Sequence, residues 1–148
     1  ILFTYNPTSR FSRLIRDVTG DPVSHVAVQS GNWIAHATHK GVHVETYVNF
    51  CKENVIVFRT ETNATEDDLI SVLRDCEFDN YDLAGVLFIG ICLELRRIGL
   101  PVPKQNLWQS SGLSFCVEFA SKIIGREESM LTAYQFYQLI NKQGESHV

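Results

Sequence analysis

The sequence predicts a single α+β domain over residues 1–148, with a small, mainly antiparallel sheet packed against helices. Two observations lead to this fold class. Short apolar runs with strand-like alternation come early, and apolar residues at helical spacing come late. The hydrophobic share of 45% and the charged share of 20% are typical of a globular protein, and 148 residues are enough for a sizeable core.

The early half begins with the apolar and aromatic run ILFTYN, which reads as a strand. A short helix is expected from Ser9 to Asp17, because Phe11, Leu14 and Ile15 recur at helical spacing. Two strands around the tight turn Ser30-Gly31-Asn32 predict a hairpin. The strands expected in this half after ILFTYN cover residues 23–29, 33–37, 42–45 and 55–60.

The late half is helical. Thr65 followed by Asp68 predicts a helix N-terminus, and Gly125 predicts a helix end. Between and after them we expect an apolar helix over 83–98, a polar loop over 104–113, helices over 114–124 and 132–141, and disorder over 144–148.

Two histidines occupy the predicted hairpin. Strand alternation places His25 with Val23 and Ala27, and His36 with Ile34. With a turn at residues 30–32, the two histidines become cross-strand neighbours, with Cβ atoms roughly 4.5–5.5 Å apart. One imidazole can then orient the other, as the general base of a nucleophile requires. Taken alone, however, each histidine is more often a hydrogen-bonded core residue than a catalyst.

Cys116 is the candidate nucleophile. It falls at the beginning of a predicted helix, after a turn rich in Gly and Ser. A helix N-terminus lowers a thiol pKa, and its amides can receive an oxyanion. The alternative is a small core residue in a first helical turn. The other cysteines, Cys51, Cys76 and Cys92, lack this context, and no Cys/His spacing suggests zinc.

These motifs carry a resemblance. SHVAVQSGNWIAHA resembles the His-bearing hairpin of NlpC-type cysteine peptidases, and FCVEFASKII resembles the nucleophile helix of their circularly permuted branch. The strand ILFT, the Arg-rich helix and the pair Tyr81-Asp82 fall where that branch has matching features. The resemblance covers residues 1 to about 125. Histidine precedes cysteine, as in the permuted branch, which includes lecithin:retinol acyltransferase-like proteins. Ala27 and Val117 depart from the usual glycine and serine.

The resemblance implies a circularly permuted papain-like fold and a cysteine hydrolase that acts as a peptidase or amidase, on peptide or cell-wall peptide amides. Cys116 would be the nucleophile, His25 the base and His36 the orienting residue, with Tyr81 and Glu118 as weaker candidates at the substrate site. The alternatives are a lipid-directed acyltransferase or thioesterase, and a non-catalytic binding module. No cofactor or metal is required.

The partner expected is a substrate with a peptide or acyl group. A net charge of −4 argues against nucleic acid, and no apolar run is long enough to span a membrane. Cysteines without evident pairing and the lack of a visible signal peptide favour a soluble, cytoplasmic protein. The sequence does not specify an oligomeric state.

Overall fold

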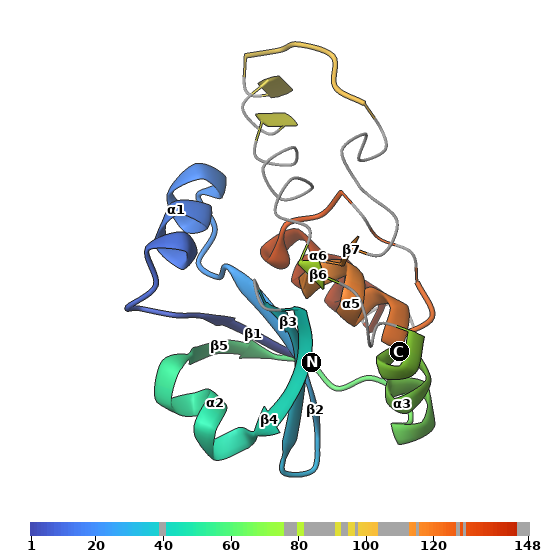
Figure 1. Ribbon diagram of the computed structural model, residues 1–148. Helices are drawn as coiled ribbons and strands as arrows, with labels where there is room; N and C mark the ends of the chain where they lie inside the picture. The colour runs from blue at the N-terminus through green and yellow to red at the C-terminus, as the bar shows by residue number, and fades with distance from the viewer. Residues whose placement is uncertain are drawn as a thin grey trace.

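The computed structural model describes residues 1–38, 41–75, 80–81, 91–92, 95–96, 98–103, 113–114, 116–126, 128 and 130–144. Within them the predicted α+β class is confirmed: a five-stranded antiparallel sheet in the order β4-β3-β2-β1-β5 carries helices on both faces (Figure 1). The sheet strands are β1 (Leu2–Tyr5), β2 (His25–Ser30), β3 (Trp33–Thr38), β4 (Gly41–Thr46) and β5 (Val55–Arg59). The helices with complete bounds are α1 (Arg10–Thr19), α2 (Tyr47–Glu53), α3 (Glu66–Asp75), α5 (Cys116–Ile123) and α6 (Ala133–Gly144).

The hairpin turn between β2 and β3 is shorter than expected. Ser30 pairs with Trp33, so Gly31 and Asn32 alone form the turn. Gly31 adopts a φ of 55°, the left-handed value that two-residue hairpin turns favour.

This register changes how the two histidines meet. Val28 pairs with Ala35, and continuing the ladder sets His36 opposite Ala27. The expectation that His25 and His36 are directly opposite is therefore wrong. They are diagonal neighbours on one face, a separation that long side chains can still bridge.

Helix α2 was not predicted. Thr46 caps its N-terminus by accepting a hydrogen bond from the Asn49 amide at 3.3 Å. Seven residues are too few to show a helical period clearly, and only Phe50 among them is buried. Phe50 has no exposed surface. It completes a small core cluster with Leu2, Ala27 and Ile34 on the face of the sheet that α2 covers.

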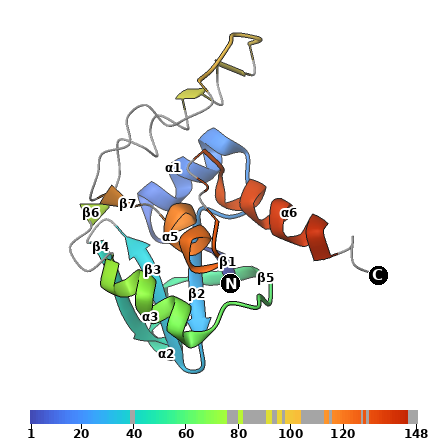
Figure 2. The same ribbon diagram turned by 90° about the vertical axis from the view of Figure 1, so that its right-hand side faces the viewer.

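The opposite face is covered by α3, α5 and α6 (Figure 2). Phe3 from β1 has no exposed surface, and its ring centroid lies 6.2 Å from that of Phe136 and 5.2 Å from that of Tyr137, both on α6. Every residue of α5 from 116 to 121 is buried. Gly125 follows with a φ of 69°, at the predicted helix end.

A second, two-stranded parallel sheet joins β6 (Asn80–Tyr81) to β7 (Leu113–Ser114), with Tyr81 paired to Ser114. The predicted helix over 83–98 and loop over 104–113 lie largely outside the described residues, as do residues 145–148; residues 91–92 and 95–96 are helical.

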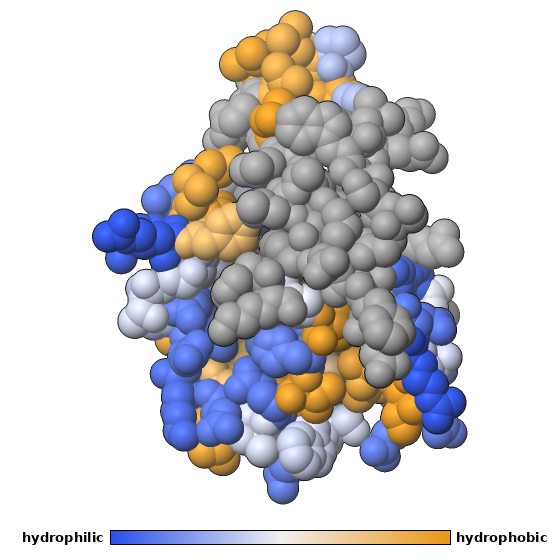
Figure 3. All heavy atoms as spheres, in the orientation of Figure 1, coloured by the Kyte–Doolittle hydropathy of each residue, from blue (hydrophilic) through white to orange (hydrophobic). Residues whose placement is uncertain are grey.

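The described surface is mostly hydrophilic over the lower part of Figure 3, and apolar side chains gather at its upper end. Ile98 and Leu100 are among the exposed large apolar side chains, with 71% and 50% of their surface exposed. None of the described helices combines the length and the apolar character needed to cross a membrane.

Candidate active site

Three polar side chains form a hydrogen-bonded line on the face of the sheet covered by α2. His25 begins β2, and its Nε2 lies 2.9 Å from Nδ1 of His36 in β3. Nε2 of His36 lies 3.0 Å from a carboxylate oxygen of Glu45 in β4. We call these three residues the His–His–Glu line. Three adjacent strands thus bring together the two predicted histidines and one carboxylate that was not predicted.

The line rests on an apolar floor supplied by α2. The Phe50 ring centroid lies 5.1 Å from that of His36, edge to face, and 6.5 Å from that of His25. His36 itself is only 4% exposed. An imidazole in such surroundings needs its hydrogen bonds, because an unpaired buried polar group is costly.

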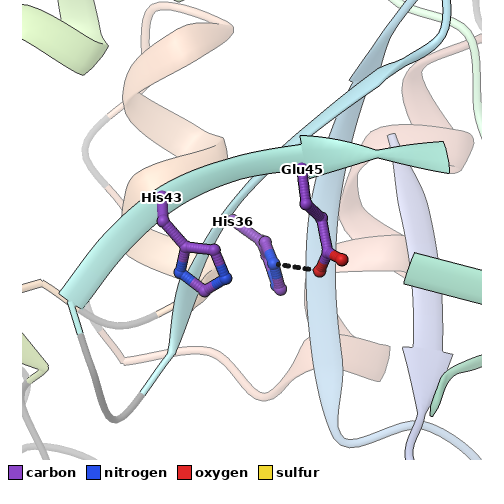
Figure 4. A group of neighbouring side chains, drawn as sticks. All are labelled: His36, His43 and Glu45. Carbon is purple, nitrogen blue, oxygen red and sulfur yellow. Dashed lines mark hydrogen bonds and ion pairs between the residues drawn. The ribbon is translucent and has the colours of Figure 1, made fainter. Parts of the chain in front are cut away.

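Glu45 is the member of the line that the sequence did not predict. The predicted strand over 42–45 already implied, by alternation, that His43 and Glu45 share a face. The sequence did not show which side chain these two residues would contact, because the pairing of β4 with β3 was unknown. In the structure His36 pairs with His43, and Figure 4 shows both histidines and Glu45 projecting to the same side.

The carboxylate fixes the position of each proton along the line. An ionised carboxylate only accepts hydrogen bonds, so Nε2 of His36 carries a proton and donates it to Glu45. A neutral His36 then has a lone pair on Nδ1, which accepts from Nε2–H of His25. The remaining nitrogen of His25, Nδ1, is left unprotonated and able to act as a base.

Both imidazoles are held neutral at pH 7. Burial lowers the pKa of His25 to about 4, and positive charge on His43 acts in the same direction. Burial also lowers the pKa of His36, again assisted by charge on the neighbouring histidines. The Glu45 carboxylate opposes this second shift, since it favours a protonated ring. His36 is nevertheless so enclosed that loss of hydration outweighs this attraction.

Cys116 begins α5, as predicted, and is 5% exposed. Backbone N–H groups of Val26, Val117 and Cys116 itself face the sulfur and favour a thiolate. Burial outweighs them and raises the pKa of the Cys116 thiol to about 11. The expectation that the helix N-terminus would give a lowered thiol pKa is therefore wrong: the amides act as expected, but loss of hydration is the larger effect.

The Cys116 sulfur lies against the backbone at the beginning of β2, next to His25. The Val26 amide that faces the sulfur belongs to the peptide that links His25 to Val26. The side chains leave on different faces, since Cys116 packs with Val26 and Val28 whereas His25 contacts Phe50. Among the described residues no hydrogen bond joins the thiol to an imidazole. Nδ1 of His25 is the ring nitrogen nearer to its own backbone, and so to this peptide.

The two predicted substrate-site residues are placed differently. The backbone of Tyr81 pairs with Ser114, two residues before Cys116, and its side chain lies outside the described part of the structure. Glu118 is buried on α5, with one carboxylate oxygen 3.8 Å from the Lys122 ammonium. Because Glu118 follows Cys116 by two positions, helical geometry directs the two side chains to nearly opposite sides of α5.

A hollow of about 230 Å³ opens beside the His–His–Glu line, lined by residues that include His25, His36, His43 and Glu45, together with Glu53 at the end of α2. Cys116 is not among its lining residues. The hollow therefore gives solvent access to the line without being lined by the thiol.

His36, His43 and Glu45 also form a group able to hold a metal ion. Each offers one ligand atom, and the three atoms lie within 4.8 Å of one another. The sequence showed no metal spacing, because these ligands come from two strands whose register was not predicted. No family model, curated protein or solved structure matches this chain.

Proposed function

We propose that this protein is a cysteine-dependent hydrolase of amide bonds on a circularly permuted papain-like fold. Cys116 is the nucleophile, His25 the general base, and His36 the residue that orients His25. The observation that carries the proposal is the His–His–Glu line, which ends at His25, the residue whose peptide lies beside the Cys116 sulfur. The order of histidine before cysteine also agrees with the permuted branch.

The line supplies what a thiol nucleophile needs. As Sγ of Cys116 attacks a carbonyl carbon, Nδ1 of His25 takes the thiol proton, and negative charge develops on the carbonyl oxygen. The backbone N–H of Cys116, at the start of α5, is available to that oxygen. The amide C–N bond then breaks, and the leaving nitrogen takes the proton from Nδ1.

Deacylation uses the same base. Nδ1 of His25 removes a proton from water, whose oxygen attacks the thioester carbon. The C–S bond breaks, the acid leaves, and the proton returns to sulfur. Throughout the cycle Nε2–H of His25 stays hydrogen-bonded to His36, and the Glu45 carboxylate offsets the positive charge that appears on the imidazole.

The resting site holds a neutral thiol and a neutral imidazole, as the raised pKa of Cys116 and the lowered pKa of His25 require. The proposal therefore has proton transfer accompany attack. Catalytic hydrogen bonds are often long in a free enzyme and shorten when substrate binds. On this proposal the Cys116 thiol and the His25 imidazole, which are not hydrogen-bonded to each other in the free protein, come together when substrate binds.

The test is acylation by p-nitrophenyl acetate, a small activated ester that reports on the nucleophile whatever the natural substrate. We expect mass spectrometry to locate the acetyl group on the peptide that contains Cys116. The His25→Gln variant should slow acylation at that peptide by roughly 10²–10⁴-fold, the usual value of general-base catalysis. Cys51, which is exposed on α2, serves as an internal reference thiol and should keep its rate.

Acylation of Cys116 at equal rates in wild type and His25→Gln would refute the assignment of the base. A circular dichroism spectrum of each variant shows whether the fold is kept.

A further inference from the structure

The group formed by His36, His43 and Glu45 has a chemistry distinct from its part in the His–His–Glu line. His43 and Glu45 are two positions apart on β4, so both project to one face, and His36 is the direct cross-strand partner of His43. The ring centroids of His36 and His43 lie 4.4 Å apart (Figure 4). Two imidazoles and a carboxylate are ligands that zinc and its neighbours among the divalent metals accept.

We propose that these three residues bind a divalent metal ion of the zinc type, and that the bound ion prevents His25 from acting as a base. The effect on chemistry, though not the metal binding itself, rests on the proposed function. Three protein ligands leave a fourth position for water, as is common for zinc held by a protein.

The three candidate ligand atoms are close to the spacing that a tetrahedral zinc site requires. Bonds of about 2.0–2.2 Å to zinc place tetrahedral ligand atoms roughly 3.3 Å apart. The three ligand atoms now lie within 4.8 Å, so closing around an ion takes small side-chain rotations. His43 is exposed and the Glu45 side chain is 27% exposed, so these two can move. His36 is held by Phe50 and His25. The hollow beside them lets an ion enter.

The consequence follows from the tautomer of His36. A neutral imidazole that binds metal through Nε2 carries its proton on Nδ1 and donates it to a neighbour. Here the neighbour is Nε2 of His25, at 2.9 Å. His25 must then accept at Nε2 and hold its own proton on Nδ1. Metal binding therefore reverses the hydrogen bond between His36 and His25 and places a proton on Nδ1 of His25, the nitrogen that would otherwise act as the base.

Glu45 thus has two exclusive uses. As a hydrogen-bond acceptor from His36 it leaves Nδ1 of His25 free to take a proton. As a metal ligand Glu45 no longer accepts a hydrogen bond from Nε2 of His36, and the hydrogen bond between His36 and His25 runs in the opposite direction.

Binding is tested with Co²⁺, whose visible absorption intensifies in a tetrahedral site. The Cys116→Ser variant is used so that the thiolate is not a ligand. We expect a band that saturates at one equivalent, is lost in the additional His43→Asn variant, and is weakened by Glu45→Gln. Glu53→Gln, which removes another carboxylate lining the same hollow, is the matched control and should keep the band. A spectrum insensitive to His43 would overturn the site.

The switch is tested in the wild-type chain by the rate at which iodoacetamide alkylates Cys116, with Zn²⁺ and with EDTA. We expect zinc to slow alkylation at least tenfold, and the ratio of the two rates to fall to about one in His43→Asn. An equal zinc effect in that variant means that zinc acts on Cys116 directly and overturns the switch. If the Co²⁺ results hold but the rate in EDTA does not depend on His25, the metal site stands, whereas the proposed function and the switch both fail.

Discussion

Two neutral imidazoles, His36 buried and His25 half-buried, should make this fold sensitive to mild acid, and His25→Gln is the change that measures the effect. Glutamine keeps an N–H that can donate to Nδ1 of His36 but does not titrate. The folded-state pKa of His25, about 4, lies below the usual unfolded value of 6.5. Its contribution to stability is therefore complete above pH 6.5 and is lost as the pH falls toward 4.

The magnitude follows from proton linkage. At pH 5 the unfolded chain holds nearly one more proton at His25 than the folded chain does, and each pH unit of such a difference is worth about 1.4 kcal/mol. Integrated from pH 7 to pH 5, His25 alone removes about 2 kcal/mol of unfolding free energy. This is a large part of the 5–15 kcal/mol that stabilises a typical domain.

The assay is urea unfolding followed by far-ultraviolet circular dichroism at pH 7, 6 and 5, with EDTA and constant salt. We expect wild type to lose about 2 kcal/mol more than His25→Gln between pH 7 and pH 5. Titrating groups away from His25 are shared by the two proteins and cancel in the comparison, and His36 stays neutral in both because burial is the largest cause of its lowered pKa. Equal losses in the two proteins would show that His25 keeps an ordinary pKa in the fold and would refute the argument that burial lowers it.

Three further predictions concern the thiol, the carboxylate and the floor of the site. The alkylation rate of Cys116 should keep rising above pH 9 without a plateau, because its pKa is raised to about 11; a plateau near pH 8 in a rate–pH profile would contradict this. Glu45→Gln should slow acylation of Cys116 by roughly tenfold, because an amide can donate to His36 and permit the wrong tautomer; Glu53→Gln is the control, and equal rates in the two variants would exclude a part for Glu45. Phe50→Ala should lower the unfolding free energy by about 3–5 kcal/mol in urea, and a loss below about 1 kcal/mol would mean that the site has no packed floor.

The strands were predictable because each is marked locally, by a short apolar run or by alternation of apolar and polar residues. The capped helix α3 was equally predictable, since Thr65 and the acidic first turn indicate where it begins. Helix α2 was not, because its seven residues bury one aromatic side chain and carry no acidic residue in the first turn. Its formation depends on the tertiary contact of Phe50 with the sheet, which no local pattern reveals.

The site residues likewise fall into those that the sequence predicted and one that it did not. His25, His36 and Cys116 could be singled out because residue type and position on an element are local properties. Glu45 could not, because its part depends on which strand lies beside β4 and in which register. The direction of the Cys116 pKa was misjudged for a related reason: helix position is legible in the sequence, whereas the depth of burial that outweighs it is set by the whole fold.

The length of the turn at Gly31 and Asn32 determines where His36 lies. Both residues are exposed, and an exposed loop tip is usually where a protein tolerates insertion. Here the Asn32 carbonyl also accepts a hydrogen bond from the Tyr47 amide at 2.8 Å, which ties the turn to the start of α2. One added residue that slipped β3 by a single position would carry His36 to the other face of the sheet. The number of residues in this exposed turn thus sets the register of β3. A change in that number would move His36 away from His25 and remove their hydrogen bond.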